Sequence, residues 1–327
     1  MIAVLPGDGI GPEVAREATR VLDRFGLDWE EHVFGGAAIR ATGSPLPDET
    51  LGACMRAEAV LKAPVGDPEF DAADVRPEQG LMRLRSELDV FANLRPAQQG
   101  EIDILIVREL VGGLYYGARG TREDGTVFDT CEYHPSQVER VARRAFELAR
   151  SRRGSLVSVD KANVLDTSRL WRRVVTDLAP DYPEVELRHA LVDSFAMELV
   201  GPLDRFDVVV TENMFGDILS DLAAAVTGGL GLAASASLGD AGPGIFEPVH
   251  GSAPDIAGTG KANPAAMLRS LALLLEHALG RSDLAAALAA AVDEVLVSHP
   301  TPDQGGSATT EEFGDAVLET LFQQAAL

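Results

Sequence analysis

Short apolar segments rich in β-branched residues recur along this chain of 327 residues, and each ends abruptly in polar residues. The clearest are residues 102–110 (IDILIVREL), 156–161 (LVSVDK) and 206–213 (FDVVVTEN). Segments of this kind are typical of parallel strands that helices cover on both faces. Amphipathic helical patterns lie between them, over residues 12–26, 135–153 and 264–280. The alternation predicts an α/β fold with a largely parallel or mixed sheet.

The charge balance argues against polyanionic partners. The chain has 51 acidic and 28 basic residues, a formal charge of −23, which repels phosphate backbones and anionic lipid surfaces. We therefore expect neither a nucleic-acid nor a membrane partner. The N-terminus lacks the basic and long apolar segments of a signal peptide, and Cys54 and Cys131 stand alone without CxxC spacing. These features favour a soluble protein in a reducing compartment, the cytoplasm.

Polar residues at the ends of the predicted strands are the first functional candidates, because chemistry in α/β sheets lies beyond the carboxyl ends of strands. They are Asp8, Arg108-Glu109, Asp160-Lys161, Asp193, which we place at the end of a strand over 189–194, and Asn213. The GDGIG sequence around Asp8 is spaced GxGxG rather than GxGxxG. It indicates either a phosphate-binding loop or simply a tight turn into a helix.

One face of a predicted helix combines residues of very different chemistry. Glu78, Leu81, Met82 and Arg85 are spaced i, i+3, i+4, i+7 and share one side of a predicted helix. An acid, two apolar groups and an arginine do not make an ordinary core face. We therefore treat this face as a candidate binding surface.

Three arginines could form an anion site. Arg85, Arg95 and Arg108 together could bind the carboxylates of a di- or tricarboxylate, which the negative global charge would otherwise repel. The alternative is three separate surface residues in an arginine-rich protein. Among the 28 basic residues only Lys62, Lys161 and Lys261 are lysines, and these mark positions where a compact, titratable amine could be required or where chance left a lysine on the surface.

Three aspartates suggest a cation site. Asp217 and Asp221 are spaced i, i+4 on an otherwise apolar helix, where like charges are destabilising unless positive charge lies between them. With Asp193 and substrate oxygens they would suit Mg²⁺ or Mn²⁺, which prefer hard oxygen ligands. The alternative is one helix-capping and one solvated aspartate.

A long loop rich in small residues is a candidate cofactor site. Residues 246–264 read FEPVHGSAPDIAGTGKANP, and small residues let a ligand approach the backbone closely. The Asp255 carboxylate could accept hydrogen bonds from ribose hydroxyls and would repel a 2′-phosphate. A plain surface loop is the alternative, although long loops in compact domains are more often functional.

Taken together, these motifs resemble the 3-isopropylmalate dehydrogenases of the isocitrate/isopropylmalate (β-decarboxylating) dehydrogenase family. The resemblance covers nearly the whole chain and rests on LPGDGIGPEV, RPEQGLMRLR, FANLRPA, VRELVGGLYYG, VDKANVL, NMFGDILSDLAAAV and FEPVHGSAPDIAGTGKANP.

The resemblance implies a fold that is not Rossmann, with two α/β domains around a large mixed sheet and a cleft between them. A cofactor-binding domain would combine residues 1–90 and 229–327. Residues 91–228 would form the dimerisation and metal/substrate domain of a homodimer with shared active sites. The implied reaction oxidises a 2-hydroxy acid with NAD⁺ and Mg²⁺ or Mn²⁺ and then releases the β-carboxylate. For 3-isopropylmalate the product is 2-oxoisocaproate, in leucine biosynthesis.

The resemblance also assigns roles residue by residue. Arg85, Arg95 and Arg108 match the arginines that bind the malate carboxylates. Asp217 and Asp221, with Asp193 from the other subunit, match the metal ligands, and Asp193 also counts as substrate-binding. Lys161 from the other subunit matches the group that removes the hydroxyl proton, and Tyr115 the acid that protonates the enol carbon. The residues that match the NAD⁺ loop are Glu247, His250, Gly251, Ser252, Ala253, Asp255, Ile256 and Asn263.

Substrate choice would rest on the face that contains Glu78. Leu81 and Met82, with Val164 from the other subunit, would enclose an isopropyl group, and Glu78 would repel an additional carboxylate. Arg83 is unusual there, and its position about 200° around the helix from Arg85 predicts that it points elsewhere. Two departures from the family pattern are the short connection of twelve residues between Arg95 and Arg108 and the LKAPVGDP sequence, which puts Lys62 and Pro64 near the implied cofactor cleft.

Three other functions remain open. A dehydrogenase for another substituted malate, such as homoisocitrate, tartrate or D-malate, would use the same residues. A phosphoryl-transfer enzyme could use GDGIG and the three aspartates, but the chain lacks the GK[ST] ending of a P-loop. A ligand-sensing relative is disfavoured because a sensor would not need the proton-transfer groups Tyr115 and Lys161.

Overall fold

The computed structural model describes residues 1–324, and the chain divides into two compact units. Unit 1 consists of Met1–Leu88 and Leu230–Leu327, and unit 2 is Asp89–Gly229. The sequence analysis placed these boundaries after residues 90 and 228. Each unit contains a mixed sheet with helices, in agreement with the predicted α/β class.

Unit 1 contains five strands in the order β2-β1-β3-β12-β11. Strands β1, β2, β3 and β12 are mutually parallel neighbours, and β11 is antiparallel to β12. Every residue of β1 and β3 is buried, in agreement with their mainly apolar sequences, and the only charged residue of the two strands is Lys62 at the end of β3. The strands are β1 (Ile2–Leu5), β2 (Trp29–Glu31), β3 (Ala59–Lys62), β11 (Ala234–Leu238) and β12 (Gly244–Pro248).

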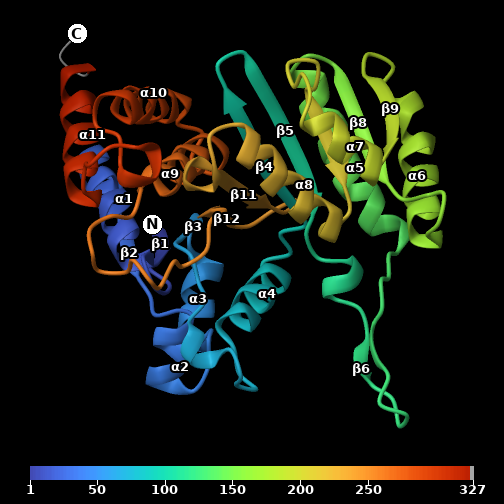
Figure 1. Cartoon of the computed structure of the whole chain (residues 1–327), viewed down its shortest axis with the longest axis horizontal. Helices are drawn as coiled ribbons and strands as arrows, with labels where there is room; N and C mark the ends of the chain where they lie inside the picture. The colour runs from blue at the N-terminus through green and yellow to red at the C-terminus, as the bar shows by residue number, and fades with distance from the viewer. Residues whose placement is uncertain (325–327) are drawn as a thin grey trace. The chain divides into compact units, whose positions relative to one another are not determined.

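The C-terminal helices of unit 1 pack around α9, which contacts β3, β11 and β12, while α1 and α10 pack against α9 (Figure 1). As predicted, α1 ends at Gly26, which adopts the left-handed conformation with φ of 66°. The α-helices are α1 (Gly11–Phe25), α2 (Gly36–Thr42), α3 (Asp48–Arg56), α4 (Pro77–Glu87), α9 (Ala265–His277), α10 (Ser282–Ser298) and α11 (Thr310–Gln324). Short 3₁₀ turns span η1 (Pro68–Phe70), η4 (Leu230–Leu232) and η5 (Pro302–Gln304).

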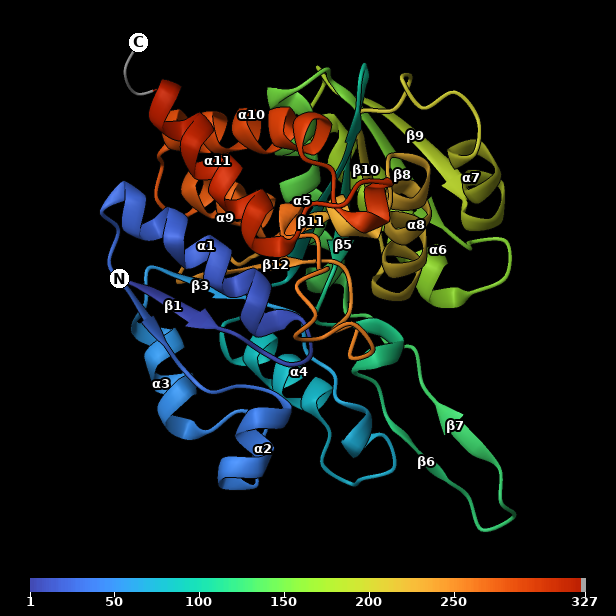
Figure 2. The same ribbon diagram turned by 60° about the vertical axis from the view of Figure 1, so that its left-hand side comes forward.

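Unit 2 contains strands in the order β4-β5-β10-β8-β9, of which only β4 is antiparallel to its neighbour. A separate antiparallel hairpin, β6–β7, projects away from the rest of the unit (Figure 2). The strands are β4 (Ala92–Gln99), β5 (Ile102–Glu109), β6 (Arg119–Thr121), β7 (Val127–Asp129), β8 (Ser155–Asp160), β9 (Glu186–Leu191) and β10 (Val208–Thr211).

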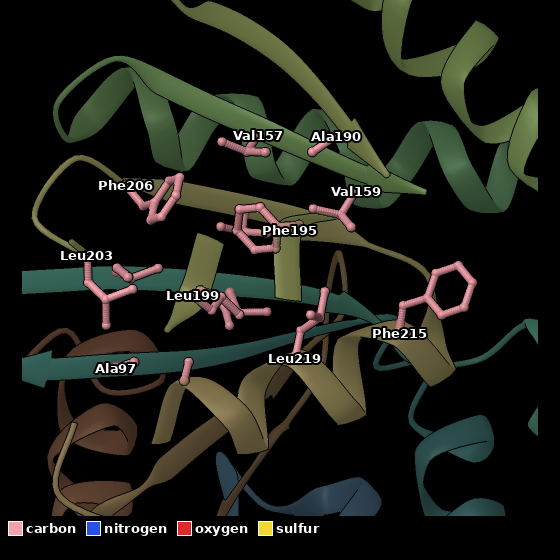
Figure 3. Close-up of a cluster of buried hydrophobic side chains, with 14 residues drawn as sticks. Ala97, Val157, Val159, Ala190, Phe195, Leu199, Leu203, Phe206, Phe215 and Leu219 are labelled. Atoms are coloured by element: carbon pink, nitrogen blue, oxygen red, sulfur yellow. The ribbon is translucent and has the colours of Figure 1, made fainter. Parts of the chain in front are cut away.

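Helices cover both faces of the unit 2 sheet. In Figure 3, Phe195 and Leu199 of α7 and Leu219 of α8 pack with Val157 and Val159 of β8 in one buried cluster. Successive side chains of a strand point to opposite faces of the sheet. On the other face, α5 packs on β5, β8 and β10. The helices are α5 (Pro135–Ser151), α6 (Asp166–Leu178), α7 (Val192–Leu199) and α8 (Asn213–Val226), with 3₁₀ turns η2 (Gly113–Tyr115) and η3 (Ala179–Asp181).

The predicted end of one strand is wrong. The strand expected over 189–194 stops at Leu191, and Asp193 lies in the first turn of α7. An acidic side chain in this place is favoured by the positive end of the helix dipole. The sequence analysis also did not predict β2, β4, β6, β7, β11 or β12, and the loop expected over 246–264 begins with the last three residues of β12. Within the described residues, no helix is both long and apolar enough to cross a membrane.

Candidate active site

The β4–β5 hairpin puts Arg95 and Arg108 on the same face of the unit 2 sheet. Asn93 pairs directly with Arg108, and side chains that are paired or two residues apart share a face. Arg95 Nε donates to Asn93 Oδ1 at 2.7 Å, beside that pair. The connection between the strands is only Gly100 and Glu101, and Gly100 has φ of 59°. The unusually short connection is therefore a tight hairpin turn.

Asn213, the first residue of α8, fixes the Arg108 guanidinium. Its Oδ1 accepts from Arg108 Nε at 3.1 Å and Nη2 at 2.8 Å, and its Nδ2 donates to Gly112 O at 3.1 Å. Arg108 Nη1 is left to donate to Asp217. A Cβ at Gly216 would lie 2.6 Å from Arg108 Cγ, so a glycine is needed where the arginine passes the helix.

The two α8 aspartates face these arginines, as their spacing required. Arg95 lies 3.3 Å from Asp217 and 3.2 Å from Asp221, and Arg108 also pairs with Asp217. Tyr115 Oη donates to Asp217 Oδ2 at 3.1 Å. Burial, followed by the Asp217 charge, raises the pKa of Asp221 despite both arginines. Neither aspartate caps α8, because Glu212 accepts from the Phe215 amide instead.

The donor set on α8 fits a hard divalent cation in part. The Asp217 and Asp221 side chains are 36% and 50% exposed, so their oxygens are accessible. Residues 1–324 contain no group of three or more His, Cys, Asp or Glu side chains that could hold a metal ion. Asp193, the third predicted ligand, lies elsewhere in unit 2. Within the described residues, α8 therefore contributes two accessible carboxylates, of the oxygen-donor type that a hard divalent cation prefers.

Asp193 and Lys161 form a second cluster in unit 2. Lys161 Nζ lies 2.5 Å from Asp193 Oδ1, and this contact lowers the pKa of Asp193. The turn that contains Lys161 is fixed by buried Asp160, which accepts from Arg172 Nε and Nη2 at 2.8 Å each. In the same turn the Val164 amide donates to Lys161 O, and the Val164 side chain is 60% exposed.

In unit 1 the face of α4 that contains Arg85 is not its core face. Pro77, Gly80 and Leu84 are buried, whereas the predicted binding residues Glu78, Leu81, Met82 and Arg85 are exposed or half-buried. Leu81 and Met82 are thus apolar side chains that stay partly accessible to solvent.

The unusual Arg83 points elsewhere, as predicted. Its Nη2 donates to Asp48 at 2.9 Å and its Nη1 to Leu46 O at 3.2 Å. Arg83 is therefore engaged with the start of α3, and it adds no available charge beside Leu81 and Met82.

Arg85 and the predicted cofactor residue Glu247 form an ion pair. Arg85 Nη2 donates to Glu247 Oε1 at 2.9 Å, and Lys62 Nζ lies 2.6 Å from Glu247 Oε2. Burial would raise the pKa of Glu247, but Lys62 and then Arg85 lower it to about 2. Glu247 is consequently a buried anion held between two cations.

The GDGIG turn supports the predicted cofactor loop. Asp8 accepts from the amides of Gly36, Ala37 and Gly66, so its own carboxylate satisfies the N-terminus of α2. Ile10 N donates to Ser252 O at 2.8 Å. The Asp8 and Gly11 amides likewise donate to Pro64 O and Asp8 O, so amides of the turn are engaged within the protein. This supports the structural alternative, a tight turn into a helix.

The loop itself leaves groups open for a ligand. His250 Nδ1 donates to Gly251 O at 2.9 Å, while its Nε2 is buried and has no hydrogen-bond partner among residues 1–324. Burial lowers the pKa of His250, so the ring is neutral and Nε2 can accept a hydrogen bond from a hydroxyl or amine. Ala253 has φ of 38°, an uncommon value for a residue other than glycine, and Asp255 is exposed.

The other predicted cofactor residues line the same segment. Ile256 is half-buried, and its amide donates to Ala253 O at 3.1 Å. Asn263 is buried; its Oδ1 accepts from Ala265 N at the start of α9, and its Nδ2 donates to Asp303 Oδ2 at 3.1 Å. Asp303 thus fixes Asn263, a partnership that the sequence analysis did not identify.

Comparison with known proteins decides the family. Residues 1–317 match the family model described as isocitrate/isopropylmalate dehydrogenase. The chain belongs to the isocitrate/isopropylmalate dehydrogenase family. The predicted family and its fold, which is not Rossmann, are confirmed.

Members of this family resemble the chain over almost its full length. A 3-isopropylmalate dehydrogenase of Zymomonas mobilis is 50% identical, over 98% of this chain and 99% of the relative. One from Bacillus cereus is 47% identical over 99% and 97%. Among solved structures, an isocitrate dehydrogenase from Methylococcus capsulatus has a TM-score of 0.91 and 36% identity over 98% of both chains. A β-decarboxylating dehydrogenase from Thermococcus kodakarensis has a TM-score of 0.86 and 38% identity over 100% and 97%.

The sequence analysis missed a buried acid cluster in this family member. Tyr133 Oη lies 3.0 Å from Glu109 Oε2 and 3.4 Å from Glu212 Oε2, and it accepts from Asn213 N at 3.0 Å. Burial raises the pKa of Glu109 to about 7. Glu109 and Asn213 were recognised as strand-end residues, but nothing local in the sequence indicated Tyr133, which lies far from both in the chain.

Proposed function

We propose that the chain is an NAD-dependent 3-isopropylmalate dehydrogenase that acts in leucine biosynthesis. It would oxidise the 2-hydroxyl group of 3-isopropylmalate, transfer a hydride to NAD⁺, release CO₂ and form 2-oxoisocaproate. Full-length relatives at 50% and 47% identity that are named 3-isopropylmalate dehydrogenase support this proposal. The observation that carries it is the α4 face, where Leu81 and Met82 are open and Arg83 is turned away toward Asp48.

That face distinguishes the substrate from other substituted malates. An isopropyl group would contact Leu81 and Met82, whereas the additional carboxylate of isocitrate or homoisocitrate would meet Glu78, an exposed acid, without a free cation from Arg83. A substituted malate such as D-malate or tartrate, which lacks the isopropyl group, would leave the apolar contacts unused. These acids remain the alternative substrates.

The arginine–aspartate cluster of unit 2 would bind the reacting part of the substrate. We propose that Arg85, Arg95 and Arg108 bind the malate carboxylates, and that Asp217 and Asp221, with Asp193 of the other subunit, hold Mg²⁺ or Mn²⁺. A divalent cation would supply Lewis-acid stabilisation of negative charge on substrate oxygens. Arg108 is already oriented for this task by Asn213.

Proton transfer would be divided between two copies of the chain. Tyr115, which already donates to Asp217, would protonate the enol carbon after CO₂ leaves. Lys161 of a second copy would accept the proton of the 2-hydroxyl group. Lys161, Asp193 and Val164 are the three residues assigned to the other subunit, and they share one cluster in unit 2. We therefore propose a homodimer in which this cluster completes the site of the partner.

Unit 1 would bind NAD⁺. The proposed contacts are Glu247, His250, Gly251, Ser252, Ala253, Asp255, Ile256 and Asn263. The unpartnered Nε2 of neutral His250 supports a ligand with a hydroxyl or amine donor. Exposed Asp255 would accept from ribose hydroxyls and disfavour the 2′-phosphate of NADP⁺.

The cysteines agree with a reducing environment, and we propose a cytoplasmic enzyme. Cys54 and Cys131 are both free, and Cys54 is buried. Burial raises the pKa of the Cys54 thiol to about 12 and also raises that of Cys131, so neither is readily ionised.

The decisive experiment is NADH formation by purified protein with NAD⁺ and Mn²⁺. Five acids should be compared at equal concentration: 3-isopropylmalate, homoisocitrate, isocitrate, D-malate and tartrate. The proposal predicts a clear preference for 3-isopropylmalate in kcat/KM. Preference for another acid would contradict the substrate assignment, and no NADH from any of the five would contradict the activity.

A further inference from the structure

A buried cluster of three charges lies at the carboxyl ends of β3 and β12 in unit 1. Lys62 is the last residue of β3, it is 1% exposed, and it is one of only three lysines in the chain. We propose that Lys62 is a positioning residue that neutralises Glu247. The positive charge of Arg85 is then not cancelled by Glu247 and stays available to a substrate carboxylate. This inference rests on the proposed function and adds a determinant of substrate affinity to it.

The sheet brings the lysine and the acid together. Strands β3 and β12 are parallel neighbours in which Leu61 pairs with Phe246, so the residues that follow, Lys62 and Glu247, lie side by side. Lys62 Nζ is 2.6 Å from Glu247 Oε2 and also donates to Ala63 O at 3.0 Å. These two contacts fix the lysine amine, so it is not free to reach a ligand.

Arg85 takes the other oxygen of the same carboxylate. Its Nη2 donates to Glu247 Oε1 at 2.9 Å, and the side chains of Arg85 and Glu247 are 12% and 8% exposed. Without Lys62, this would be a closed pair with no net charge. With Lys62, two cations surround one anion, and the cluster has a net charge of +1. Charge in such a dry place acts strongly on a nearby ligand.

Arg85 also has unused hydrogen-bonding capacity. Its Nε is buried, with no hydrogen-bond partner among residues 1–324. A buried guanidinium N–H that lacks an acceptor is costly, and a planar carboxylate is the acceptor that the guanidinium fork fits best. The excess charge and the open donor therefore belong to the same residue, on the α4 face beside Leu81 and Met82.

A purely structural role would not need the lysine charge. Buried ion pairs contribute little stability relative to apolar side chains of similar size. If Lys62 served only packing, its replacement by methionine would alter stability and leave substrate affinity unchanged. Charge and packing can thus be separated by experiment.

The test compares Lys62→Met with the wild type at saturating NAD⁺ and Mn²⁺. We expect the KM for 3-isopropylmalate to rise about tenfold or more, because a positive charge is lost from a poorly solvated site. The KM for NAD⁺ and the kcat at saturating substrate should change less than about twofold. Arg56→Met is the matched control, because it removes a cation from an exposed position on α3 of the same unit.

A double variant tests directly whether the net charge of this cluster determines the affinity for the substrate. Lys62→Met with Glu247→Gln again leaves one positive charge, on Arg85, and should recover most of the lost affinity for 3-isopropylmalate. An unchanged substrate KM in Lys62→Met, or a double variant no better than the single one, would overturn the inference. A change confined to kcat or to thermal stability would also overturn it, since that is the outcome of a structural role.

Two further variants keep the test decisive if Lys62→Met does not fold. Lys62→Arg retains the charge and should keep the substrate KM within about twofold of wild type. Glu247→Gln alone raises the net charge of the cluster and should lower the substrate KM; a KM that does not fall would refute the inference. Failure of the proposed function is distinguishable, because it would appear as a wild-type enzyme that forms no NADH with any of the five acids.

Discussion

Glu247 in unit 1 and Glu109 in unit 2 are both buried at the carboxyl end of a strand, yet their pKa values are shifted in opposite directions. The pKa of Glu247 is lowered to about 2, and that of Glu109 is raised to about 7. Burial acts on both in the same sense, because it disfavours the charged form. The difference lies in the neighbours: Glu247 contacts Lys62 and Arg85, whereas Glu109 accepts from two backbone amides and Tyr133.

The partners of a carboxylate, more than its depth, decide its charge. Glu247 stays an anion because it contacts the two cations Lys62 and Arg85. Asp217 and Asp221 balance two arginines and remain half exposed, so they are available to a cation. Glu109, which has no ion-pair partner in the described part of the chain, is a carboxyl that can hold a proton.

The largest effect on turnover is expected from replacing Lys161, which contacts Asp193 in unit 2. Lys161→Ala should reduce kcat about a thousandfold or more, because a positioned proton acceptor is lost, while NAD⁺ binding stays near normal. Steady-state NADH formation and a titration of NAD⁺ fluorescence quenching measure the two quantities. Arg173→Ala, an exposed cation on α6, is the control. Near-normal turnover would contradict the role of Lys161.

Replacing Asp217 tests whether the aspartates that pair with Arg95 and Arg108 also bind a cation. Asp217→Asn should lower kcat/KM at least about a hundredfold and weaken Mn²⁺ binding, since a ligand that stabilises charge on the substrate is removed. Binding of Mn²⁺ by electron paramagnetic resonance provides a readout independent of turnover. Asp204→Asn changes an exposed acid of the same unit and should leave both unchanged. Unaltered Mn²⁺ affinity would show that these acids serve only the arginines.

Glu109 provides the pH test of the comparison. Its folded-state pKa of about 7 lies above the ordinary value of 4.5, so the folded protein binds more protons between these values. Stability from this group is present below pH 4.5 and is lost as the pH rises through 7. Between pH 5 and 8 the wild type should lose about 2.5 kcal/mol more than Glu109→Gln.

Urea unfolding at several pH values measures that difference. Glu101→Gln, an exposed acid in the β4–β5 turn, should follow the wild type at every pH. Parallel pH profiles of wild type and Glu109→Gln would mean that the Glu109 carboxyl is ionised in the folded protein, and the contrast with Glu247 would disappear.

The smallest expected effect concerns an exposed carboxylate, Asp255. Asp255→Ala should reduce the preference for NAD⁺ over NADP⁺ about tenfold, because removing a solvated charge from a 2′-phosphate relieves only modest repulsion. The ratio of kcat/KM for the two cofactors measures it. Asp240→Ala, an acid in the β11–β12 turn, should not alter this ratio. If both variants leave the ratio unchanged, Asp255 has no discriminating role.

Several elements followed from local pattern alone. The buried strands β5, β8 and β10, the end of α1 at Gly26 and the mixed face of α4 were predictable because periodicity and capping act over a few residues. The need for positive charge between Asp217 and Asp221 was also predictable from their spacing, and Arg95 meets it.

Other features required the folded chain. Asp193 was expected at the end of a strand but lies in the first turn of α7, since a boundary between a strand and a following helix leaves little signal in sequence. Tyr133 joins Glu109 and Glu212 from a distant segment. Glu247 was assigned to a cofactor loop, and its contact with Arg85 spans 162 residues.

Motifs and short-range periodicity were enough to identify the family, the α/β class and most residues with suitable chemistry. Which of those residues are charged, and what each charge faces, became known from the folded chain. The physical reason is that burial and Coulomb interactions depend on distance in space. Lys62 shows this most plainly: the sequence marks it as rare, and the fold makes it the partner of Glu247.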